Sequence, residues 1–591
     1  MKTVPPNEPT GVLVHRQRPA RRADDPAIEA TAGVDPRRWL TLAVLCISLL
    51  IIVIDNTIVN VALPTLVRQL GASVSQLQWV VDAYTVVFAG LLLLAGALGD
   101  RFGRRRSLTF GLSVFAVGSA AAAFAGGVGQ LIVARAVMGG AAAFIMPATL
   151  SILTNVFTEA RERALAIGLW SGVVGIGVVL GPVAGGFLLD HFWWGSVFIV
   201  NVPIAVAAIV AGRMLVPESR DPDAQRVDWF GATLSVVGLV SLVSAIIEGP
   251  SRGWTNSLSL GLFALAAVAL ASFAVWENRV DAPMLDVRFF RNPRFSAASA
   301  NITLMFFALF GFVFLSTQYL QFVLGYSPLS AGLRTLPFAG AMLTVAPFSS
   351  KLVERIGTKR AVVIGMLTFA TGLVLASTMT TATGYPRLGF AMLLLGAGLG
   401  MSSAPATESI MGSLPRHRAG VGSALNDTAR EVGGALGVAV VGSIVSSIYR
   451  SRLTDTLPRT VPAPIASAAH DSIGSALQAG NVLGADRLQF VTAAREAFVA
   501  AMSRASIVTA AVAVIGAVIA ARYLPSRAAE ALESAEAEVA PPTAHTPAHL
   551  VMADSIDCHV HLPHRIAACD TRDRASTAHR TVATSDRAGL R

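Results

Sequence analysis

The chain has 591 residues, of which 53% are hydrophobic and only 14% are charged. This composition excludes a string of soluble domains, so the formal net charge of +10 does not point to a nucleic-acid-binding protein. Apolar segments long enough to cross a bilayer core of about 30 Å recur along most of the sequence. We therefore expect an all-α polytopic membrane protein.

The first part of the chain predicts a polar tail followed by six membrane spans. Residues 1–38 are polar and basic and contain no apolar core, which indicates a cytosolic tail rather than a cleaved signal peptide. Residues 39–216 form the first six-span half. Its expected spans are Leu40–Leu63, Leu77–Leu98, Leu108–Ala125, Leu131–Val156, Ala164–Leu189 and Val197–Leu215.

Two extra spans separate this half from a second one. Residues 217–294 are a charged linker that contains the spans Phe230–Ile247 and Leu258–Val275. Residues 295–525 then carry six more spans. These are Phe295–Val323, Ala331–Leu352, Ala361–Met379, Leu388–Met411, Val421–Ile448 and Ser506–Tyr523.

Lysine and arginine concentrate in the loops after the even-numbered spans, so both termini are expected in the cytosol. Residues 450–496 are then a long external loop. Residues 526–591 form a cytosolic tail of disordered composition. Its cysteines and histidines match no closed zinc module, so we predict no metal site.

A degenerate repeat relates the two halves. The segment Gly96–Arg106, GALGDRFGRRR, returns as Ser350–Arg360, SKLVERIGTKR. An ungapped alignment pairs Asp100 with Glu354 and Gly103 with Gly357. An acidic residue, a glycine turn and a basic cluster, duplicated between apolar spans, predict a transporter built from two parallel halves.

With these residues in view, the chain resembles the major facilitator superfamily, in particular its drug–proton antiporter branch with 14 spans (EmrB/QacA type). The Gly96–Arg106 loop is similar to the signature between spans two and three of that superfamily. Further similar segments are Asp55–Pro64 in span one, Leu131–Ala143 in span four, Gly177–Gly186 in span five and Trp193–Ile204, which runs into span six. The resemblance implies the major facilitator fold: two six-helix halves plus two inserted helices.

Three charged residues inside spans are the candidates for proton coupling: Asp55, Asp82 and Arg135. A carboxylate at the middle of a span costs about 2.5–3.5 kcal/mol on insertion scales, so such residues usually mark function. Arg135 begins span four at the depth of Asp55 and is expected to approach Asp55 or Asp82. The alternatives are a structural ion pair for Asp55, placement at the membrane interface for Asp82, and a side chain reaching the interface for Arg135.

Two further motifs predict conformational control. The resemblance implies a latch at the loop after span two. This gating motif comprises Gly96, Asp100, Arg101, Gly103, Arg104 and Arg105. In span five, small residues predict close packing between the halves, and the proline predicts a kink. This antiporter motif comprises Gly177, Gly181, Pro182, Gly185 and Gly186.

Span nine carries a candidate substrate-binding face at helical spacing. It consists of Phe307, Phe310, Phe314, Gln318 and Gln321. An aromatic helix face that ends in two glutamine side chains suits flat lipophilic ligands and cations. Packing or lipid contact would explain the same row of residues. In span thirteen, Asp427, Arg430 and Glu431 are interpreted as a self-paired structural cluster.

The sequence thus predicts a proton-coupled multidrug efflux antiporter that exports lipophilic or cationic compounds by alternating access across a bacterial plasma membrane. The alternatives are a dedicated exporter of one metabolite or antibiotic and a membrane receptor or scaffold without transport. The spans contain no nucleotide-binding loop, metal-ligand set or nucleophile constellation, so we expect neither an enzyme nor a cofactor.

Overall fold

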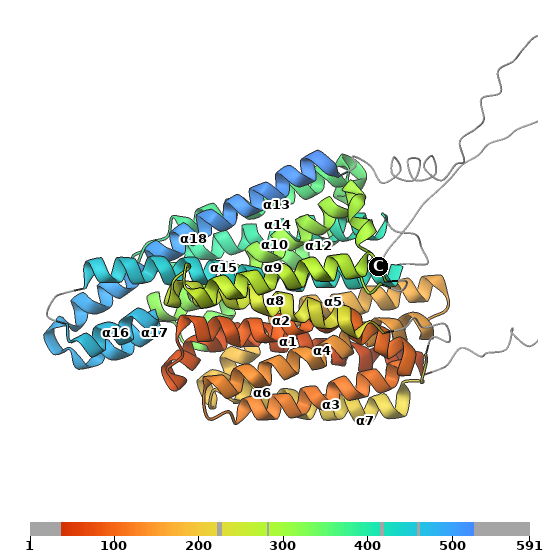
Figure 1. The fold of residues 1–591 in the computed structure, drawn as a ribbon, viewed down its shortest axis with the longest axis horizontal. Helices are drawn as coiled ribbons and strands as arrows, with labels where there is room; N and C mark the ends of the chain where they lie inside the picture. The colour runs from red at the N-terminus through yellow and green to blue at the C-terminus, as the bar shows by residue number, and fades with distance from the viewer. Residues whose placement is uncertain (1–36, 221–226, 281–282, 414–418, 458–460, 525–591) are drawn as a thin grey trace, which may run out of the picture. The chain divides into compact units, whose positions relative to one another are not determined.

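The computed structural model describes residues 37–220, 227–280, 283–413, 419–457 and 461–524, and every regular element in these ranges is helical (Figure 1). Fourteen helical segments are long and apolar enough to span a membrane, so the predicted all-α polytopic fold and its number of spans are confirmed. Helices suit a bilayer because each satisfies its backbone hydrogen bonds internally.

The first half packs around α1 and α4. Its elements are α1 (Arg38–Leu70), α2 (Val74–Phe102), α3 (Arg104–Ala123), α4 (Val128–Val156), α5 (Ala160–His191), α6 (Ser196–Ile199) and α7 (Asn201–Leu215). The closest partners are α2 with α4, α3 with α4, and α1 with α5. The sixth span is divided, because one residue, Val200, separates the end of α6 from the start of α7 at Asn201.

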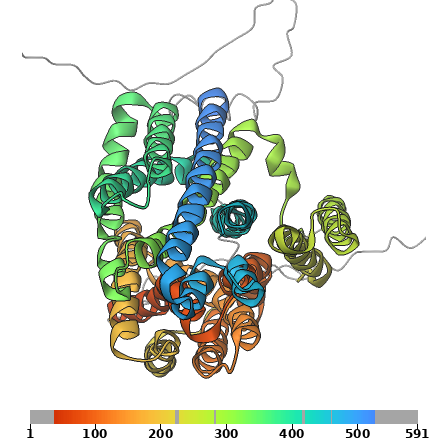
Figure 2. The same ribbon diagram turned by 90° about the vertical axis from the view of Figure 1, so that its left-hand side faces the viewer.

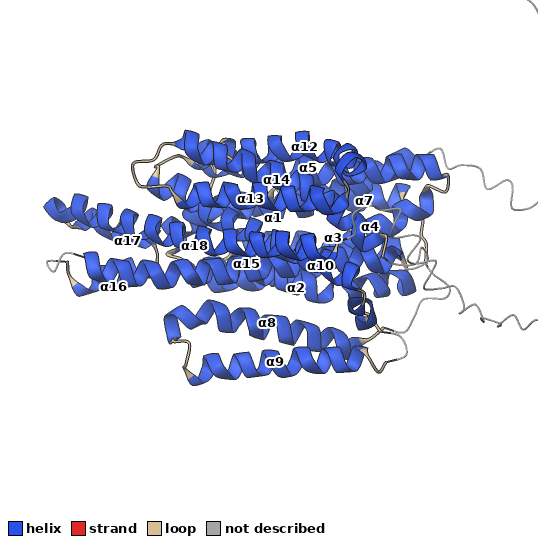
Figure 3. Cartoon of the chain, turned by 90° about the horizontal axis from the view of Figure 1, so that it is seen from above, coloured by secondary structure: helices blue, strands red, loops and turns tan. Residues whose placement is uncertain are grey.

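The two extra spans form a helical hairpin of α8 (Trp229–Arg252) and α9 (Ser257–Glu277), which lies beside the bundle in Figure 3. α8 packs against α2 of the first half and also against α15 of the second. The hydroxyl of Ser443 in α15 donates to the carbonyl oxygen of Ile246 in α8 at 2.7 Å. Most side chains of α9 are exposed. The hairpin therefore spans the seam between the halves.

The second half begins with η2 (Val287–Arg291) and has α10 at its centre. Its transmembrane elements are α10 (Pro293–Gln318), its π-helical extension η3 (Tyr319–Val323), α11 (Pro328–Leu333), α12 (Leu336–Ile356), α13 (Thr358–Ser377), α14 (Tyr385–Met411), α15 (Ala419–Thr456) and α18 (Arg487–Tyr523). Figure 2 shows α15, in teal, nearly end-on. α15 packs against α2 of the first half, whereas α18 packs against α13, α10 and α15 of its own half.

The segment expected as a long loop, residues 450–496, is mostly helical. It contains the end of α15, the short helices α16 (Ala463–Asp471) and α17 (Ile473–Ala479), the turns η5 (Gly480–Val482) and η6 (Gly484–Asp486), and the start of α18. The last span therefore begins at Arg487 and not at Ser506. A helix of 37 residues is about 55 Å long, which exceeds the hydrocarbon thickness, and hydropathy detects only its apolar part.

Contacts between the halves gather at one end of the bundle, where α1 ends and α2 begins; we call this the α1–α2 end. There Gln321 Nε2 donates to Val61 O at 2.9 Å, and Arg68 Nη2 donates to Gln321 Oε1 at 3.2 Å. Gln478 of α17 donates to Arg68 O at 2.7 Å. Among the described residues, side-chain hydrogen bonds between the halves all lie toward this end.

Candidate functional site

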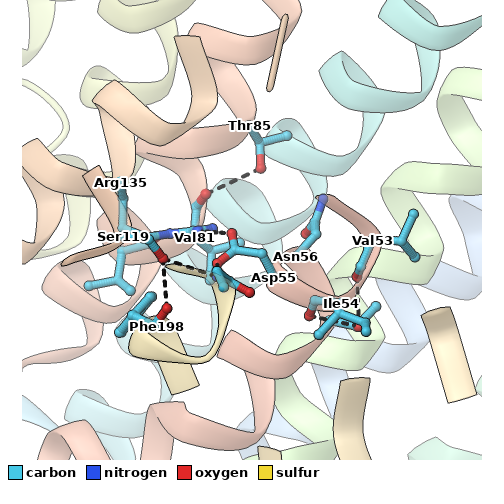
Figure 4. Close-up of polar contacts among 12 residues, drawn as sticks. Val53, Ile54, Asp55, Asn56, Val81, Thr85, Ser119, Arg135 and Phe198 are labelled. Carbon is cyan, nitrogen blue, oxygen red and sulfur yellow. Dashed lines mark hydrogen bonds and ion pairs between the residues drawn. The ribbon is translucent and has the colours of Figure 1, made fainter. Parts of the chain in front are cut away.

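A buried ion pair lies in the interior of the first half. Asp55 of α1 and Arg135 of α4 are both fully buried, and Arg135 Nη1 contacts Asp55 Oδ2 (Figure 4). Arg135 Nε also donates to the carbonyl oxygen of Val80 in α2 at 3.0 Å. The structure thus brings together two of the three predicted proton-coupling residues, and Arg135 approaches Asp55 rather than the membrane interface.

The second oxygen of Asp55 is held by residues that the sequence analysis did not single out. Asn201, the first residue of α7, donates from Nδ2 to Asp55 Oδ1 at 2.9 Å. The same Nδ2 reaches Ser119 Oγ of α3 at 3.1 Å, and the Ser119 hydroxyl donates to Phe198 O at 2.8 Å. The only sequence signal for Asn201 was its place in the family-like segment Trp193–Ile204.

An aromatic ring completes the surroundings of the arginine. The guanidinium carbon of Arg135 lies 4.3 Å from the centroid of the Tyr84 ring, close enough for a cation–π interaction. Breaking a buried pair by removing one partner typically costs about 3–5 kcal/mol, because the remaining charge is left uncompensated. The site therefore holds a carboxylate whose charge is balanced only while Arg135 remains beside it.

Asp82 occupies a different setting on α2. Its side chain is fully buried, and neither carboxylate oxygen has a hydrogen-bond partner among the described residues. One turn earlier, Gln78 donates to the carbonyl oxygens of Val438 and Ala439 in α15, at 3.2 and 2.9 Å. This stretch of α2 therefore lies against the second half. The interior position of Asp82 argues against an interfacial role beside Trp79.

The antiporter motif packs in two directions. Gly177, Gly181 and Gly185 face α1, where an added Cβ would lie within 2.6 Å of Val53, Thr57 or Ile58 atoms. Gly186 faces α11 of the second half, where a Cβ would lie 2.5 Å from Leu329 Cα. Next to it, Pro182 packs against Gly332 of α11. The motif thus joins α5 to its own half and to the opposite one.

The gating motif is held by its own half and by the segment after α7. Asp100 Oδ1 pairs with Arg104 Nε at 2.8 Å. Glu218 accepts the backbone N–H of Arg105 at 3.1 Å and lies 3.6 Å from that residue's Nε. Within the described residues, Gly96 and Arg101 of the motif form no hydrogen bond or ion pair with Glu218. Gly96 faces Pro147 of α4, and the Arg101 guanidinium lies over the Phe102 ring. Glu218 was not predicted as part of this site.

We expect Gly103→Ala to destabilise the fold by about 1–3 kcal/mol, because a side chain there is both strained and crowded. Gly103 has φ +117°, and an added Cβ would lie 2.6 Å from Glu218 Oε1. Thermal unfolding in detergent measures the effect on stability, and the transport rate measures the effect on function.

Gly71→Ala is the matched control. Gly71 also has positive φ, +65°, but an added Cβ would meet nothing within 4 Å. Equal losses in the two variants would show that crowding of the new side chain against Glu218 adds nothing to the cost of its positive φ.

The predicted aromatic face of α10 is largely closed in this conformation. Phe314 is fully buried, and a Cβ on Gly434 of α15 would lie 3.3 Å from the Phe310 ring. The backbone of Phe307 packs against Gly437 of α15 in the same way. Gln318 Nε2 donates to Phe314 O at 3.0 Å, and Gln321 bridges to α1 as described above. The amides are therefore occupied by protein contacts.

The charged residues of α15 pair as predicted. Arg430 Nη1 lies 3.8 Å from Asp427 Oδ1, and its guanidinium carbon lies 5.3 Å from the Phe306 ring centroid. Glu431 Oε2 is buried and has no hydrogen-bond partner among the described residues. The cluster is thus internally paired except for Glu431.

Comparison with known proteins places this arrangement in a family context. Residues 45–438 match the family model described as Major Facilitator Superfamily. The chain is 37% identical over 492 residues to the multidrug efflux pump LfrA of Mycolicibacterium smegmatis, covering 82% of this chain and 97% of that protein. It is 34% identical to the tetracenomycin C resistance and export protein of Streptomyces glaucescens, covering 91% and 98% of the two chains.

A third relative is the methyl viologen resistance protein SmvA of Salmonella typhimurium, 34% identical over 78% of this chain and 93% of that protein. Among solved structures, the fold is similar to a bacterial homologue of the human lysosomal transporter Spinster in an inward-facing, unoccupied conformation. The TM-score is 0.60 at 18% identity, covering 83% of this chain and 98% of that one.

Proposed function

The chain belongs to the major facilitator superfamily, as its motifs predicted, and it is a transporter rather than an enzyme; from this we propose that it exports lipophilic or cationic drugs in exchange for protons. The observation that carries the proposal is the buried pair of Asp55 and Arg135. A charge pair inside apolar spans is costly to maintain, which favours a functional role.

The pair supplies a way to couple proton and substrate. An ionised Asp55 neutralises Arg135, whereas a protonated Asp55 leaves the arginine without its counter-charge. A cationic substrate that binds near this pair and a proton that binds Asp55 therefore act on the same local charge balance. Binding of one disfavours binding of the other, which is the requirement for antiport. Asp82 is the proposed second proton site.

The basic loops set the proposed orientation in the bacterial plasma membrane. The α2–α3 turn carries Arg101, Arg104, Arg105 and Arg106, so we assign that end to the cytosol, together with both termini. The α1–α2 end is then external. Because the hydrogen bonds between the halves gather there, the described conformation corresponds to one closed outside and accessible from the cytosol.

The substrate class rests on the relatives. Their names describe export of or resistance to several unrelated compounds, including methyl viologen, which is a flat organic cation. Flat lipophilic cations suit the aromatic face of α10 once its contacts with α15 loosen. A dedicated exporter of a single antibiotic is the second candidate, because the tetracenomycin C relative matches 91% of the chain.

Inverted membrane vesicles energised to an acidic interior provide the test. A pH-gradient dye reports proton release as a panel of lipophilic cations is added. We expect several compounds to collapse the gradient in vesicles with the protein and not in vesicles without it. A response to one compound only would favour the dedicated exporter, and no response to any compound would contradict proton-coupled drug export.

We expect Asp82→Asn to lower the number of protons exchanged per substrate from two to one. Exchange of one proton for one monovalent cation moves no net charge, so it uses only the pH gradient, about 1.4 kcal/mol per unit. A second proton adds about 2.3 kcal/mol per 100 mV of membrane potential. Efflux of a monovalent cation from proteoliposomes, at fixed pH gradient and varied potential, measures the difference.

Asp455→Asn is the control, because Asp455 is an exposed acid at the end of α15. Efflux should depend on potential in the wild type and in this control, and should lose that dependence in Asp82→Asn. Unchanged dependence in all three proteins would exclude Asp82 as a proton site.

A further inference from the structure

Asn201 lies where it can respond to the protonation of Asp55. It is fully buried at the start of α7, between Asp55 of α1 and Ser119 of α3. Its Nδ2 group donates to both, at 2.9 Å and 3.1 Å. An ionised carboxylate only accepts hydrogen bonds, so this orientation of the amide matches the charged form of Asp55.

The other end of the amide has no partner. Asn201 Oδ1 is buried, and within the described part of the chain no group donates to it. Leaving a buried polar atom unpaired costs free energy, so such an atom in a charged site calls for an explanation. A protonated Asp55 has one O–H group to donate and needs an acceptor for it. Asn201 Oδ1 can accept this hydrogen bond, and it belongs to the amide that already contacts Asp55.

The side-chain amide of Asn201 can form a hydrogen bond with either protonation state of Asp55 if the amide rotates. After rotation about its terminal bond, Oδ1 faces Asp55 and accepts from the new O–H, while Nδ2 occupies the former position of Oδ1. Ser119 permits this exchange, since its hydroxyl both accepts from Asn201 and donates to Phe198 O. It can rotate to donate to the turned amide oxygen.

We propose that Asn201 is a positioning residue for the proton-binding step, holding Asp55 in place in both protonation states so that only the contact with Arg135 changes. The inference rests on the proposed proton-coupled function. A proton from water adds to Asp55 Oδ1 and forms an O–H bond, and no other covalent bond changes. Arg135 then loses the charge of its partner and is free to move.

Other ionisable groups near the pair do not replace Asn201. Arg135 contacts the opposite oxygen of Asp55, and Tyr84 of α2 lies under the guanidinium. Glu431 of α15 and Asp82 of α2 form no ion pair or hydrogen bond with Asp55 within the described residues. From α3 and α7 the groups that face Asp55 are the uncharged Ser119 and Asn201.

The pH profile of transport distinguishes positioning from simple packing. Asn201→Leu keeps the shape of the side chain but removes the donor to the ionised carboxylate. We expect the pH of half-maximal efflux to move upward by about one unit, because Asn201 binds the ionised carboxylate about twice as strongly as the turned amide binds the neutral acid. Asn201→Asp places a second carboxyl there and should move the profile in the same direction.

Asn301→Leu is the matched control. Asn301 is a fully buried asparagine in α10, and its Nδ2 donates to Gly516 O at 3.1 Å, away from Asp55. Its profile should coincide with that of the wild type. Should Asn201→Leu fail to fold, Ser119→Ala removes the hydroxyl that braces the amide and should give a smaller shift in the same direction.

The outcomes separate this inference from the function on which it rests. A shifted profile in the Asn201 and Ser119 variants, with none in Asn301→Leu, supports the positioning role. Folded Asn201 variants with the wild-type profile, in a protein whose efflux still requires Asp55, would overturn it alone. Wild-type protein without proton-coupled efflux would instead overturn the proposed function.

Discussion

Asp55→Asn is expected to reduce proton-coupled efflux to the level of membranes that lack the protein, a loss of at least about 100-fold. The asparagine resembles a permanently protonated Asp55, so the site can no longer release a proton when substrate binds. A 100-fold loss corresponds to about 2.7 kcal/mol, slightly less than the about 3–5 kcal/mol for breaking one buried charge pair, so the loss should be at least this large. Dye-monitored efflux in inverted vesicles measures the loss.

Removing the carboxylate also leaves Arg135 buried without its counter-charge, so folding must be measured alongside transport. Thermal unfolding in detergent tests this, and the double variant Asp55→Asn with Arg135→Gln removes both charges together. Asp455→Asn removes an exposed carboxylate outside the site and is the control for loss of a negative charge alone. Proton-coupled efflux by a folded Asp55→Asn protein would show that another residue carries the proton.

Gly186→Leu is expected to lower the transport rate by at least about tenfold by preventing closure of the α1–α2 end. An added Cβ would lie 2.5 Å from Leu329 Cα and 2.7 Å from Pro328 O. These are backbone atoms, so α5 and α11 must separate to make room. A cysteine at Ala331, a buried residue of α11, should react faster with an external thiol reagent in this variant, in a background without the three native cysteines.

The same helix offers the control. An added Cβ at Gly172 of α5 would meet nothing within 4 Å, so Gly172→Leu should transport normally and leave the cysteine at Ala331 protected. If Gly186→Leu transported at the wild-type rate with the same reactivity at position 331, the close approach of α5 and α11 would be irrelevant to the cycle.

The membrane spans were predictable because lipid offers the backbone no hydrogen-bonding partners. Every backbone group inside a bilayer must be satisfied within a helix, so apolar length alone predicted fourteen crossings. Outside the bilayer that constraint disappears. The extension of α18 back to Arg487 and the helices α16 and α17 depend on packing of short side chains, and hydropathy carries no record of such packing.

The proposed proton site was predictable in part for the same reason. Asp55 and Arg135 stand out as charges within apolar spans at similar depth, and a charge there needs a partner. Asn201 and Ser119 were not predictable, because neutral polar side chains are common in membrane helices and become informative only when folding aims them at Asp55. Likewise, Gln321 fits a ligand face by spacing, whereas its bond to Val61 O depends on how the halves meet.

The inserted hairpin of α8 and α9 is placed so that movement of the two halves would be transmitted to the surrounding membrane. α8 touches α2 on one side of the seam and α15 on the other, so rocking of the halves must shear its packing. Few residues of its partner α9 are buried, so α9 is expected to displace lipid as it follows. We therefore expect membrane thickness and lateral pressure to affect the rate of transport.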